Sequence, residues 1–493
     1  LGNLAKTKEG KDAEDLYYQS CEKYKKPIEI KPDNHEAYNN WGSYLGDLAK
    51  TKEGKEAEDL YYQSFEKYRK AIEIKPDNHE AYNNWGSYLG DLAKTKEGKE
   101  AEDLYHQSFE KYRKAIEIKP DNHEAYNNWG SYLGDLVKTK EGKEAEDLYY
   151  QLFEKYRKAI EIKPDNHEAY NNWGNFLGDL AKTKEGKEAE DLYYQSFEKY
   201  RKAIEIKPDI HEAYNNWGSS LGDLAKTKEG KEAEDLYHQS FEKYRKAIEI
   251  KPDKHEAYNN LGSYLGDLAK TKEGKEAEDL YHQSFEKYRK AIEIKPDIHE
   301  AYNNWGGNLW NLAKTKEGKE AEDLYHQSFE KYRKAIEIKP DNHGAYNNWG
   351  VSLGNLAKTK EGKEAEDLYY QSFEKYNKAI EIKPDNHEAY NNWGVSLWNL
   401  AKTKEGKEAE DLYHQSFEKL RKAMELGGGH YNLACFFAIK GNEKEAIHYL
   451  ELSLSKSAID VNFVESDEDW KDFLNKKEFI DLMKKHRLKY TKA

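Results

Sequence analysis

The sequence predicts an all-α fold, an α-solenoid of stacked antiparallel helical hairpins, and three observations support this prediction. The first is an internal period of 44 residues without any insertion or deletion. The second is a pair of apolar stripes at helical spacing in each unit, and the third is a Lys-Pro-Asp triplet between units. A fixed period of this size is typical of a stacked array. The leucines that mark it are Leu1, Leu45, Leu89, Leu133, Leu177, Leu221, Leu265, Leu309, Leu353 and Leu397.

The first helix of a unit is expected over residues 35–51. Its apolar stripe consists of Tyr38, Trp41, Gly42, Leu45, Leu48 and Ala49. The proline of the triplet disfavours helical geometry in the residue before it, so the preceding helix ends there. In the next unit, either Asp77 or Asn78 can cap the first helix with its side chain, and Asp77 and Glu80 have capping-box spacing.

The second helix is expected over residues 56–74, after a short turn over residues 52–55. Gly54 in this turn is suited to cap the C-terminus of the first helix. The stripe of the second helix consists of Ala57, Leu60, Tyr61, Ser64, Phe65, Tyr68, Ala71 and Ile72. Because neither helix can bury its stripe alone, the hairpins are expected to stack.

Composition is consistent with an ordered protein that carries charges of both signs. The chain has 493 residues, a formal net charge of −14, 40 Tyr and 11 Trp, and the aromatic rings supply the apolar surface of a core. Interleaved positive and negative side chains argue against a nucleic-acid partner. No apolar run reaches about 18 residues, so no membrane span is predicted. The two cysteines, Cys21 and Cys435, form no disulfide framework, which leaves the compartment open and favours the cytoplasm over secretion.

The units resemble the tetratricopeptide repeat (TPR). The family pattern is an aromatic residue, a large apolar residue followed by Gly, another large residue, then A-x3-F and a terminal Pro, and residues of these kinds appear here in the same order. The matching residues are Tyr38, Trp41, Gly42, Leu45, Ser64, Tyr68, Ala71 and Pro76. The departure is in length, because the stretch from Leu45 to Ser64 is about ten residues longer than in the usual 34-residue unit. The resemblance implies a right-handed superhelix, in which the Gly42 position lets helices approach closely.

We expect residues 1–426 to form about ten of these 44-residue repeats, the first incomplete. Residues 427–456 have the spacing of a TPR-like repeat of standard length, with Leu433, Ala434 and Phe437 followed by Gly441. Residues 457–493 resemble the capping helices that follow terminal repeats in this family, and a cap would cover an apolar face that no repeat covers.

The copies differ from one another mainly on one face of the first helix. The altered positions are those of Ser43, Tyr44, Gly46 and Asp47, and on a helical wheel all but Tyr44 lie away from the apolar stripe. In the TPR family this face lines a concave groove for peptides or partner helices, so the resemblance implies a non-enzymatic scaffold that binds protein or peptide there. An asparagine ladder would suit capture of a peptide backbone, because an amide side chain both donates and accepts.

The expected site residues fall into three groups. The ladder comprises Asn39, Asn83, Asn127, Asn171, Asn215, Asn259, Asn303, Asn347 and Asn391. The acidic positions are Asp47, Asp91 and Asp135. The divergent positions are Trp310, Asn311, Val351, Asn355, Val395, Trp398 and Asn399. The basic clamp with which some TPR domains hold a C-terminal carboxylate is not visible, since Glu36 and Asn39 stand where it would need cations.

Two alternatives stay open at this point. The divergence can be drift on an exposed face, with Trp310 and Trp398 filling space left where Tyr44 became Asn308 or Ser396; as exposed residues, these tryptophans would instead be binding hot spots. The chain can also be a structural spacer or a self-assembling rod, since it starts part-way through a unit and an uncapped N-terminal end could stack on a second copy.

No cofactor, metal site or catalytic centre is expected. P-loop, H-E-x-x-H and C-x-x-C motifs do not occur. The repeated histidine at His35 would place imidazoles about 10 Å apart in neighbouring helices, whereas zinc needs ligands at about 2 Å. Cys435 lies among Leu433, Phe436 and Phe437 and is expected to be a buried structural thiol. A basic cluster at Lys67, Arg69 and Lys70 alternates with acidic residues, which favours a solvated surface over a nucleic-acid contact.

Overall fold

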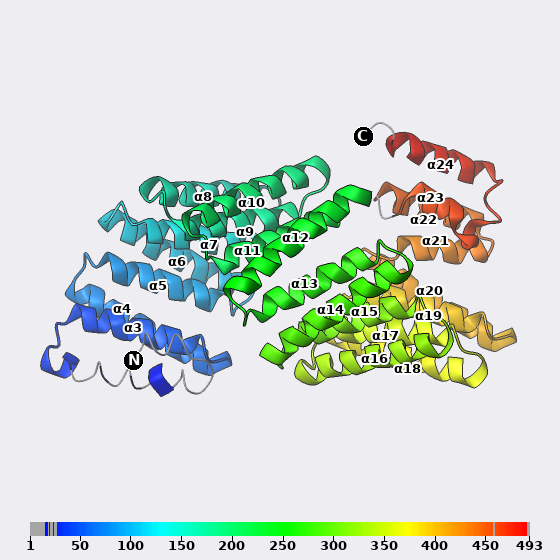
Figure 1. The fold of residues 1–493 in the computed structure, drawn as a ribbon, viewed down its shortest axis with the longest axis horizontal. Helices are drawn as coiled ribbons and strands as arrows, with labels where there is room; N and C mark the ends of the chain where they lie inside the picture. The colour runs from blue at the N-terminus through cyan, green and yellow to red at the C-terminus, as the bar shows by residue number, and fades with distance from the viewer. Residues whose placement is uncertain (1–14, 18, 20–22, 24–26, 457–458, 491–493) are drawn as a thin grey trace. The chain divides into compact units, whose positions relative to one another are not determined.

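The computed structural model of the chain describes residues 15–17, 19, 23, 27–456 and 459–490. They divide into two compact units, an N-terminal unit Leu1–Lys251 and a C-terminal unit Pro252–Ala493. Every regular element among these residues is a helix, and the helices follow one another in antiparallel pairs (Figure 1). The predicted α-solenoid is confirmed. None of the described helices is both long and apolar enough to cross a bilayer.

The first helices of the N-terminal unit are α3 (His35–Ala49), α5 (His79–Ala93), α7 (His123–Val137), α9 (His167–Ala181) and α11 (His211–Ala225). Its second helices are α4 (Gly54–Ile74), α6 (Gly98–Ile118), α8 (Gly142–Ile162), α10 (Gly186–Ile206) and α12 (Gly230–Ile250).

In the C-terminal unit the first helices are α13 (His255–Ala269), α15 (His299–Ala313), α17 (His343–Ala357) and α19 (His387–Ala401). The second helices are α14 (Gly274–Ile294), α16 (Gly318–Ile338), α18 (Gly362–Ile382) and α20 (Gly406–Glu425). A shorter pair follows, α21 (His430–Ile439) and α22 (Glu443–Ser455), and then α23 (Val461–Ser466), a 3-10 turn η1 (Glu468–Trp470) and α24 (Lys477–Tyr490).

Helix ends are set by the residues around the Lys-Pro-Asp triplet and the glycine turn. Of the two candidate caps it is Asn78 that acts, because its side-chain oxygen accepts from the Ala81 amide at 3.1 Å. The prediction for Gly54 was wrong. The first helix ends at Ala49, and Gly54 is the first residue of α4, with a φ of 57° that only glycine adopts without strain.

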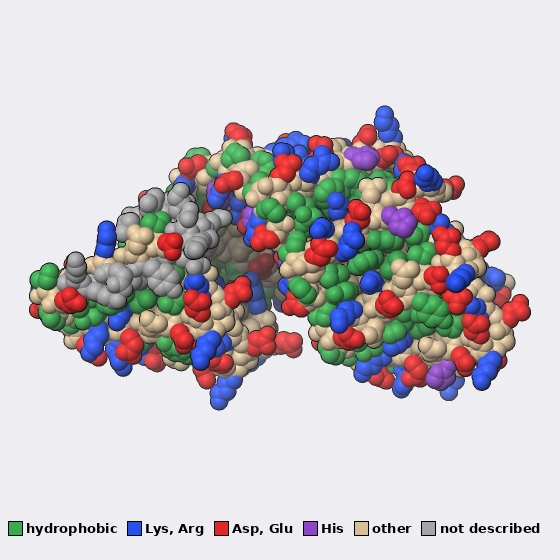
Figure 2. All heavy atoms as spheres, turned by 90° about the horizontal axis from the view of Figure 1, so that it is seen from below, with side chains coloured by type: hydrophobic (Ala, Val, Ile, Leu, Met, Phe, Trp, Pro, Cys, Tyr) green, Lys and Arg blue, Asp and Glu red, His purple; other side chains and the backbone are tan. Residues whose placement is uncertain are grey.

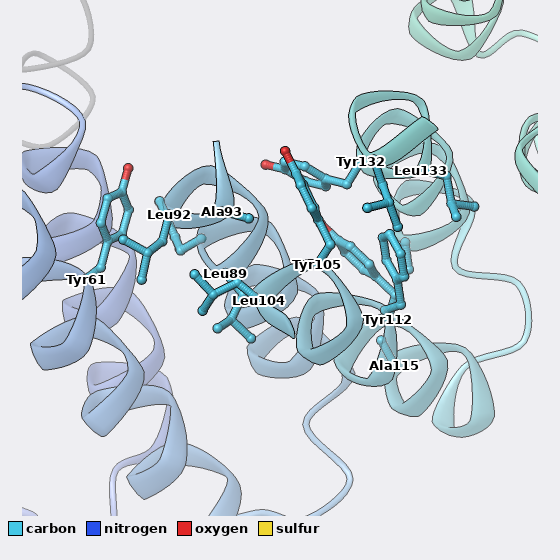
Figure 3. Packing of buried hydrophobic residues seen from close by; sticks show 14 of the residues in the cluster. Tyr61, Leu89, Leu92, Ala93, Leu104, Tyr105, Tyr112, Ala115, Tyr132 and Leu133 are labelled. Atoms are coloured by element: carbon cyan, nitrogen blue, oxygen red, sulfur yellow. The ribbon is translucent and has the colours of Figure 1, made fainter. Parts of the chain in front are cut away.

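Each hairpin packs through the predicted stripes. The Tyr68 ring is fully buried, and a Cβ atom placed on Gly42 would lie 3.0 Å from it, so the close approach expected at this glycine is confirmed. The Ser64 hydroxyl donates to the Gly42 carbonyl at 2.7 Å across the same pair. Between successive hairpins, the rings of Tyr105, Tyr112 and Tyr132 gather beside leucines, as Figure 3 shows. Tyrosine therefore supplies much of the core.

Within each unit the helices are unequally spaced. Among the described helices, successive first helices, such as α3 and α5 or α13 and α15, touch each other more than successive second helices do. A stack curves toward the side on which its elements lie closer. The first helices therefore line the inner face of each unit, which agrees with the face implied by the resemblance.

The last helices pack on the short pair. Trp470 of η1, Phe473 and Phe479 are buried against a cluster that includes Ala434 and Leu450 of the short pair. This arrangement covers the end of the stack with apolar contacts, as a terminal cap does. The uncapped N-terminal end proposed for self-association falls mainly on residues 1–14, outside the described residues.

Candidate functional site

The asparagine ladder lies between the repeats more than on an open surface. Asn84 Nδ2 donates to Asn39 Oδ1 at 3.4 Å, and the corresponding bond from Asn432 to Asn391 measures 2.9 Å. The ladder residues that are buried are Asn39, Asn83, Asn127, Asn259 and Asn347, and those that are half-buried are Asn171, Asn215, Asn303 and Asn391. Most of the hydrogen-bonding capacity that we assigned to a peptide backbone is thus turned toward the next repeat.

The aspartates also connect repeats. Asp91 accepts from the Tyr132 hydroxyl at 2.8 Å and pairs with Lys50 of the preceding repeat at 2.8 Å. Asp47 accepts from Tyr88 in the same way, also at 2.8 Å. Asp135 pairs with Lys94 at 3.0 Å. Asp91 and Asp135 thus hold a lysine of the preceding repeat, and Asp47 and Asp91 accept from a tyrosine hydroxyl of the following repeat.

The glycine at position 46 faces the following repeat. A Cβ atom on Gly46 would lie 2.4 Å from the Tyr88 ring, and one on Gly354 would lie 3.0 Å from the Ser396 hydroxyl. By the same register, Trp310 at the glycine position stands opposite Ser352, which takes the place of the tyrosine in the following repeat. The large and small side chains therefore balance between two successive repeats and not within one. The small serine leaves room for the indole.

The two tryptophans differ in exposure. Trp398 is only 6% exposed and packs edge-on against Phe436, with ring centroids 5.2 Å apart, so the expectation of an exposed indole is wrong there. Trp310 is half-buried, and the Lys314 ammonium lies 4.4 Å from its ring centroid. Only Trp310 of the two contributes to an open surface of the inner face.

A cavity of about 440 Å³ opens on the inner face of the C-terminal unit, where the copies diverge. At its wall, Gly307 and Val351 stand where Ser43 and Ser87 offer a hydroxyl to a second-helix tyrosine, and Asn308 stands where other copies have a tyrosine. Its lining comes mainly from the first helices α13, α15, α17 and α19, with Lys270 just after α13 and one tyrosine each from α14 and α16: Ser263, Asp267, Lys270, Tyr288, Asn303, Asn304, Gly307, Asn308, Trp310, Asn311, Tyr332, Asn347, Asn348, Val351, Glu388 and Asn392.

Some of the predicted site residues line this cavity and others do not. The structure brings together Asn303, Asn347, Trp310, Asn311 and Val351. It leaves Asn355, Val395, Trp398 and Asn399 outside the cavity wall, and Asn355 donates to the Val351 carbonyl at 2.9 Å. Lys270 and Glu388 also line the cavity, and they are copies of Lys50 and Glu36. The sequence places both of these positions on the groove side of the first helix, but the expected site residues did not include them because they are nearly constant between copies.

The basic cluster on the second helix is engaged within the protein. Lys67 Nζ lies 4.1 Å from the centroid of the Trp41 ring, and Lys70 pairs with Glu73 at 2.6 Å. Figure 2 shows positive and negative side chains mixed over the visible face. This arrangement is a solvated surface with local ion pairs.

Three groups with ligand atoms lie together near the C-terminus. Cys435, Asp467 and Asp469 have ligand atoms within 4.8 Å of one another. Asp467 accepts from the Tyr431 hydroxyl at 2.6 Å and caps η1 through the Asp469 amide at 3.0 Å. Burial raises the pKa of the Cys435 thiol well above its usual range, so it stays protonated at neutral pH. The buried thiol is the one expected, and the cluster is part of the terminal packing.

Two G-x-S-x-G strings, which sequence reasoning overlooked, occur at residues 218–222 and 350–354. This is the spacing of a nucleophile elbow, which needs a sharp strand-to-helix turn that exposes the serine. Here both strings lie inside helices, α11 and α17, and Ser352 is fully buried with its hydroxyl 3.2 Å from that of Ser328. Neither serine has the geometry of a nucleophile.

Comparisons with known proteins find matches to parts of this chain. A family model described as plant specific mitochondrial import receptor subunit TOM20 matches residues 197–304. The search of curated proteins found no match. The solved structure of YrrB, described as a TPR protein with an unusual peptide-binding site, is 20% identical and covers 48% of this chain and 95% of its own, with a TM-score of 0.30.

Two further solved structures are similar in extent. TTC0263, a thermophilic TPR protein of Thermus thermophilus, is 13% identical, over 46% of this chain and 98% of its own, with a TM-score of 0.35. PilF of Pseudomonas aeruginosa is 15% identical, over 54% of this chain and 99% of its own, with a TM-score of 0.37. Similarity at this level says nothing about a ligand. The residue order within the repeat, the Gly42–Tyr68 packing and the paired helices identify the chain as an α-solenoid of TPR-like repeats whose unit is lengthened to 44 residues.

Proposed function

We propose that the chain is a non-enzymatic scaffold that binds a protein or peptide segment on the inner face of its C-terminal unit. The observation that carries this proposal is the coincidence of the cavity with the divergent residues. A cavity of about 440 Å³ has the size of a site for several side chains. Its wall combines an aromatic ring, Trp310, with amide side chains that can donate and accept.

Packing alone does not require this opening. In α5 and α7 the corresponding positions hold serine and tyrosine side chains that fill the space between repeats. The copies around the cavity carry smaller residues at Gly307, Asn308 and Ser352 and larger ones at Trp310 and Val351, yet α15 and α17 have the same lengths as α5 and α7. A cleft kept open in an otherwise filled stack is the kind of surface that a partner's side chains can enter.

A cavity-filled variant tests the proposal. It combines Gly307→Ser, Asn308→Tyr, Trp310→Gly, Val351→Ser and Ser352→Tyr, which recreate the packing of α5 and α7 in the stack. Because that packing already exists in the N-terminal unit, the variant is expected to fold. The matched control is Tyr370→Ala, at a side chain 47% exposed on the second helix α18.

The measurement is affinity capture from an extract of the source cells by the native chain, the cavity-filled variant and the control. We expect a protein that is captured by the native chain and the control and is lost from the cavity-filled variant. Equal capture by all three would place the binding surface elsewhere. Capture by none would favour the rival function, a structural spacer.

A further inference from the structure

Lysines at the end of the first helices are neutralised across repeats in the N-terminal unit. Lys50 Nζ lies 2.8 Å from Asp91, and the same pair recurs one repeat later between Lys94 and Asp135 at 3.0 Å. The next two pairs are Lys138 with Asp179 at 3.0 Å and Lys182 with Asp223 at 3.2 Å. Each lysine therefore faces a carboxylate of the following repeat.

The C-terminal unit keeps the lysines and loses these carboxylates. Asn311, Asn355 and Asn399 stand where the aspartates would face Lys270, Lys314 and Lys358. Each first helix from α3 to α13 carries one Glu and one Asp, whereas α17 carries neither, because Gly344 also replaces the glutamate of its first turn. All of these changes remove negative charge from the same face.

The lysines that remain have few anionic neighbours. Lys270 pairs with Asp267 of its own helix at 2.7 Å, and Lys314 contacts the Trp310 ring. At the far end, Lys402 lies 5.2 Å from the centroid of the Trp398 ring. Burial raises the pKa of the Asp469 carboxyl in the C-terminal tail, and the charge of Lys402 offsets part of that rise. The other acidic group at the cavity is Glu388. The least compensated charges are those of Lys314 and Lys358.

The charges of neighbouring lysines in this row oppose one another. Burial, followed by the charges of Lys402 and Lys314, lowers the pKa of Lys358. Burial and Lys270 lower the pKa of Lys314 in the same way. In the N-terminal unit, burial also lowers the pKa of Lys182, but Asp223 and Asp179 outweigh it and the net shift is upward. A bound anion would relieve the repulsion in the C-terminal unit.

We propose that Lys314 and Lys358, flanked by Lys270 and Lys402, form a lysine column that binds an acidic peptide in extended conformation along the inner face. The inference rests on the proposed function and names the chemistry of its partner. Lys270 and Asn311 line the cavity, so the column and the cavity are continuous. Neighbouring packed helices lie about 10 Å apart. An extended chain in the polyproline II form advances about 3.1 Å per residue with three residues per turn, so acidic residues at every third position lie on one side of the peptide and would meet successive lysines.

A peptide fits this surface better than a nucleic acid. The chain carries a net charge of −14, which disfavours a long polyanion over its whole length. The cavity that Lys270 lines also has amides, such as Asn347 and Asn392, and the apolar side chains of Trp310 and Val351. Amides match a peptide backbone, and the apolar side chains match uncharged residues between the acidic ones.

The test uses the full chain and two labelled peptides of about twelve residues, the length needed to span four lysines. One peptide has Glu at every third position among Ser and Ala, and the other has Gln in place of each Glu. Binding is followed by fluorescence anisotropy. We expect the acidic peptide to bind roughly tenfold more tightly or better. Its affinity should fall as salt rises from about 0.1 M to about 1 M, because the screening length drops from about 10 Å to about 3 Å.

Restoring the missing carboxylates is the decisive variant. Asn355→Asp with Asn399→Asp recreates the pairs of the N-terminal unit at Lys314 and Lys358 and should weaken binding roughly three- to tenfold. The matched control, Lys94→Gln with Lys138→Gln, removes lysines at the same positions of paired repeats and should leave the affinity unchanged. The mirror variant, Asp135→Asn with Asp179→Asn, frees those two lysines and should add a second, weaker site.

Equal binding of the acidic peptide to the native chain and to the carboxylate-restored variant would overturn the proposal. So would equal affinity for the Gln peptide; if the cavity-filled variant then lost that peptide, the scaffold function would stand without the charge preference. A single-stranded oligonucleotide that binds more tightly than the acidic peptide would replace the peptide as the ligand class. Failure of both peptides and of the oligonucleotide would overturn the lysine column outright.

Discussion

Substitution of Gly90 by alanine tests how tightly successive repeats pack against each other at this position. An added Cβ atom at Gly90 would lie 2.5 Å from the Tyr132 ring, far inside contact distance. The ring cannot move away freely, since Tyr132 is 8% exposed and its hydroxyl is bonded to Asp91. The matched site in the C-terminal unit is Gly354, where the added atom would lie 3.0 Å from the small Ser396 hydroxyl.

The two substitutions should change the stability of the stack in opposite directions. Alanine in a helix interior is favoured over glycine by about 1 kcal/mol, and this gain applies at both sites. Overpacking a filled core costs about 1–3 kcal/mol, and this cost applies only at Gly90. Gly90→Ala should therefore destabilise the stack locally by about 0–2 kcal/mol, whereas Gly354→Ala should stabilise it by up to about 1 kcal/mol, because the serine hydroxyl can rotate.

The assay is amide hydrogen exchange read separately for α5 to α7 and for α17 to α19, because a long repeat array need not unfold in one step. Exchange should accelerate around α7 in Gly90→Ala and slow around α19 in Gly354→Ala. Adding Tyr132→Ser to Gly90→Ala should recover part of the loss, which a double-mutant cycle would detect. Equal protection in the two single variants, or no coupling in the cycle, would refute the reasoning.

Three further outcomes follow from the packing and the ion pairs. Ser64→Ala removes a buried hydrogen bond of 2.7 Å across the hairpin and should cost about 1 kcal/mol, measured by exchange in α3 and α4. Trp398→Ala empties the contact with Phe436 and should cost about 3–5 kcal/mol, lost as protection of α21. Lys316, bonded to Glu278 at 2.8 Å, lowers the pKa of that carboxyl below 4.5. The stability that this ion pair adds is complete above the unfolded pKa of the Glu278 carboxyl and is lost as the pH falls through its lowered pKa in the folded chain. Lys316→Gln should therefore narrow the difference between the urea midpoints measured at about pH 6 and at about pH 3.

The fold was predictable from the sequence because the hairpin interior depends on local spacing. Leu48, Leu60, Tyr61, Phe65 and Tyr68 were all assigned to the core from helical periodicity, and all are buried. The turn was harder. Gly54 needs a positive φ at either of two places, the end of one helix or the start of the next, and composition does not distinguish them.

The inner face was predictable as a surface, but its internal contacts were not. A helical wheel places Gly46 and Asn39 away from the apolar stripe, and it treats that side as open. In the stack, the following repeat covers this side through Tyr88 and Asn84. Contacts between repeats depend on the offset of one hairpin against the next, which periodicity within a single helix does not contain.

These contacts between repeats bear on whether the divergent face has merely drifted. The hydroxyls of Tyr88 and Tyr132 constrain Asp47 and Asp91, so these aspartates are held in place by the following repeat. Where the following residue is Ser352, Ser396 or Phe436, the hydroxyl is missing or replaced, and there the aspartate has become Asn311, Asn355 or Asn399.

Loss of the tyrosine hydroxyl allows the aspartate to be replaced by asparagine but does not require the replacement. Asp135, Asp179 and Asp267 also precede repeats without the tyrosine, with Phe176, Ser220 and Asn308 in its place, and all three remain aspartates. Drift that followed release alone would touch these positions as readily as the others. The three asparagines instead succeed one another in α15, α17 and α19, opposite lysines that thereby lose the carboxylate of the following repeat. A ligand that supplies the missing negative charge accounts for both their kind and their order.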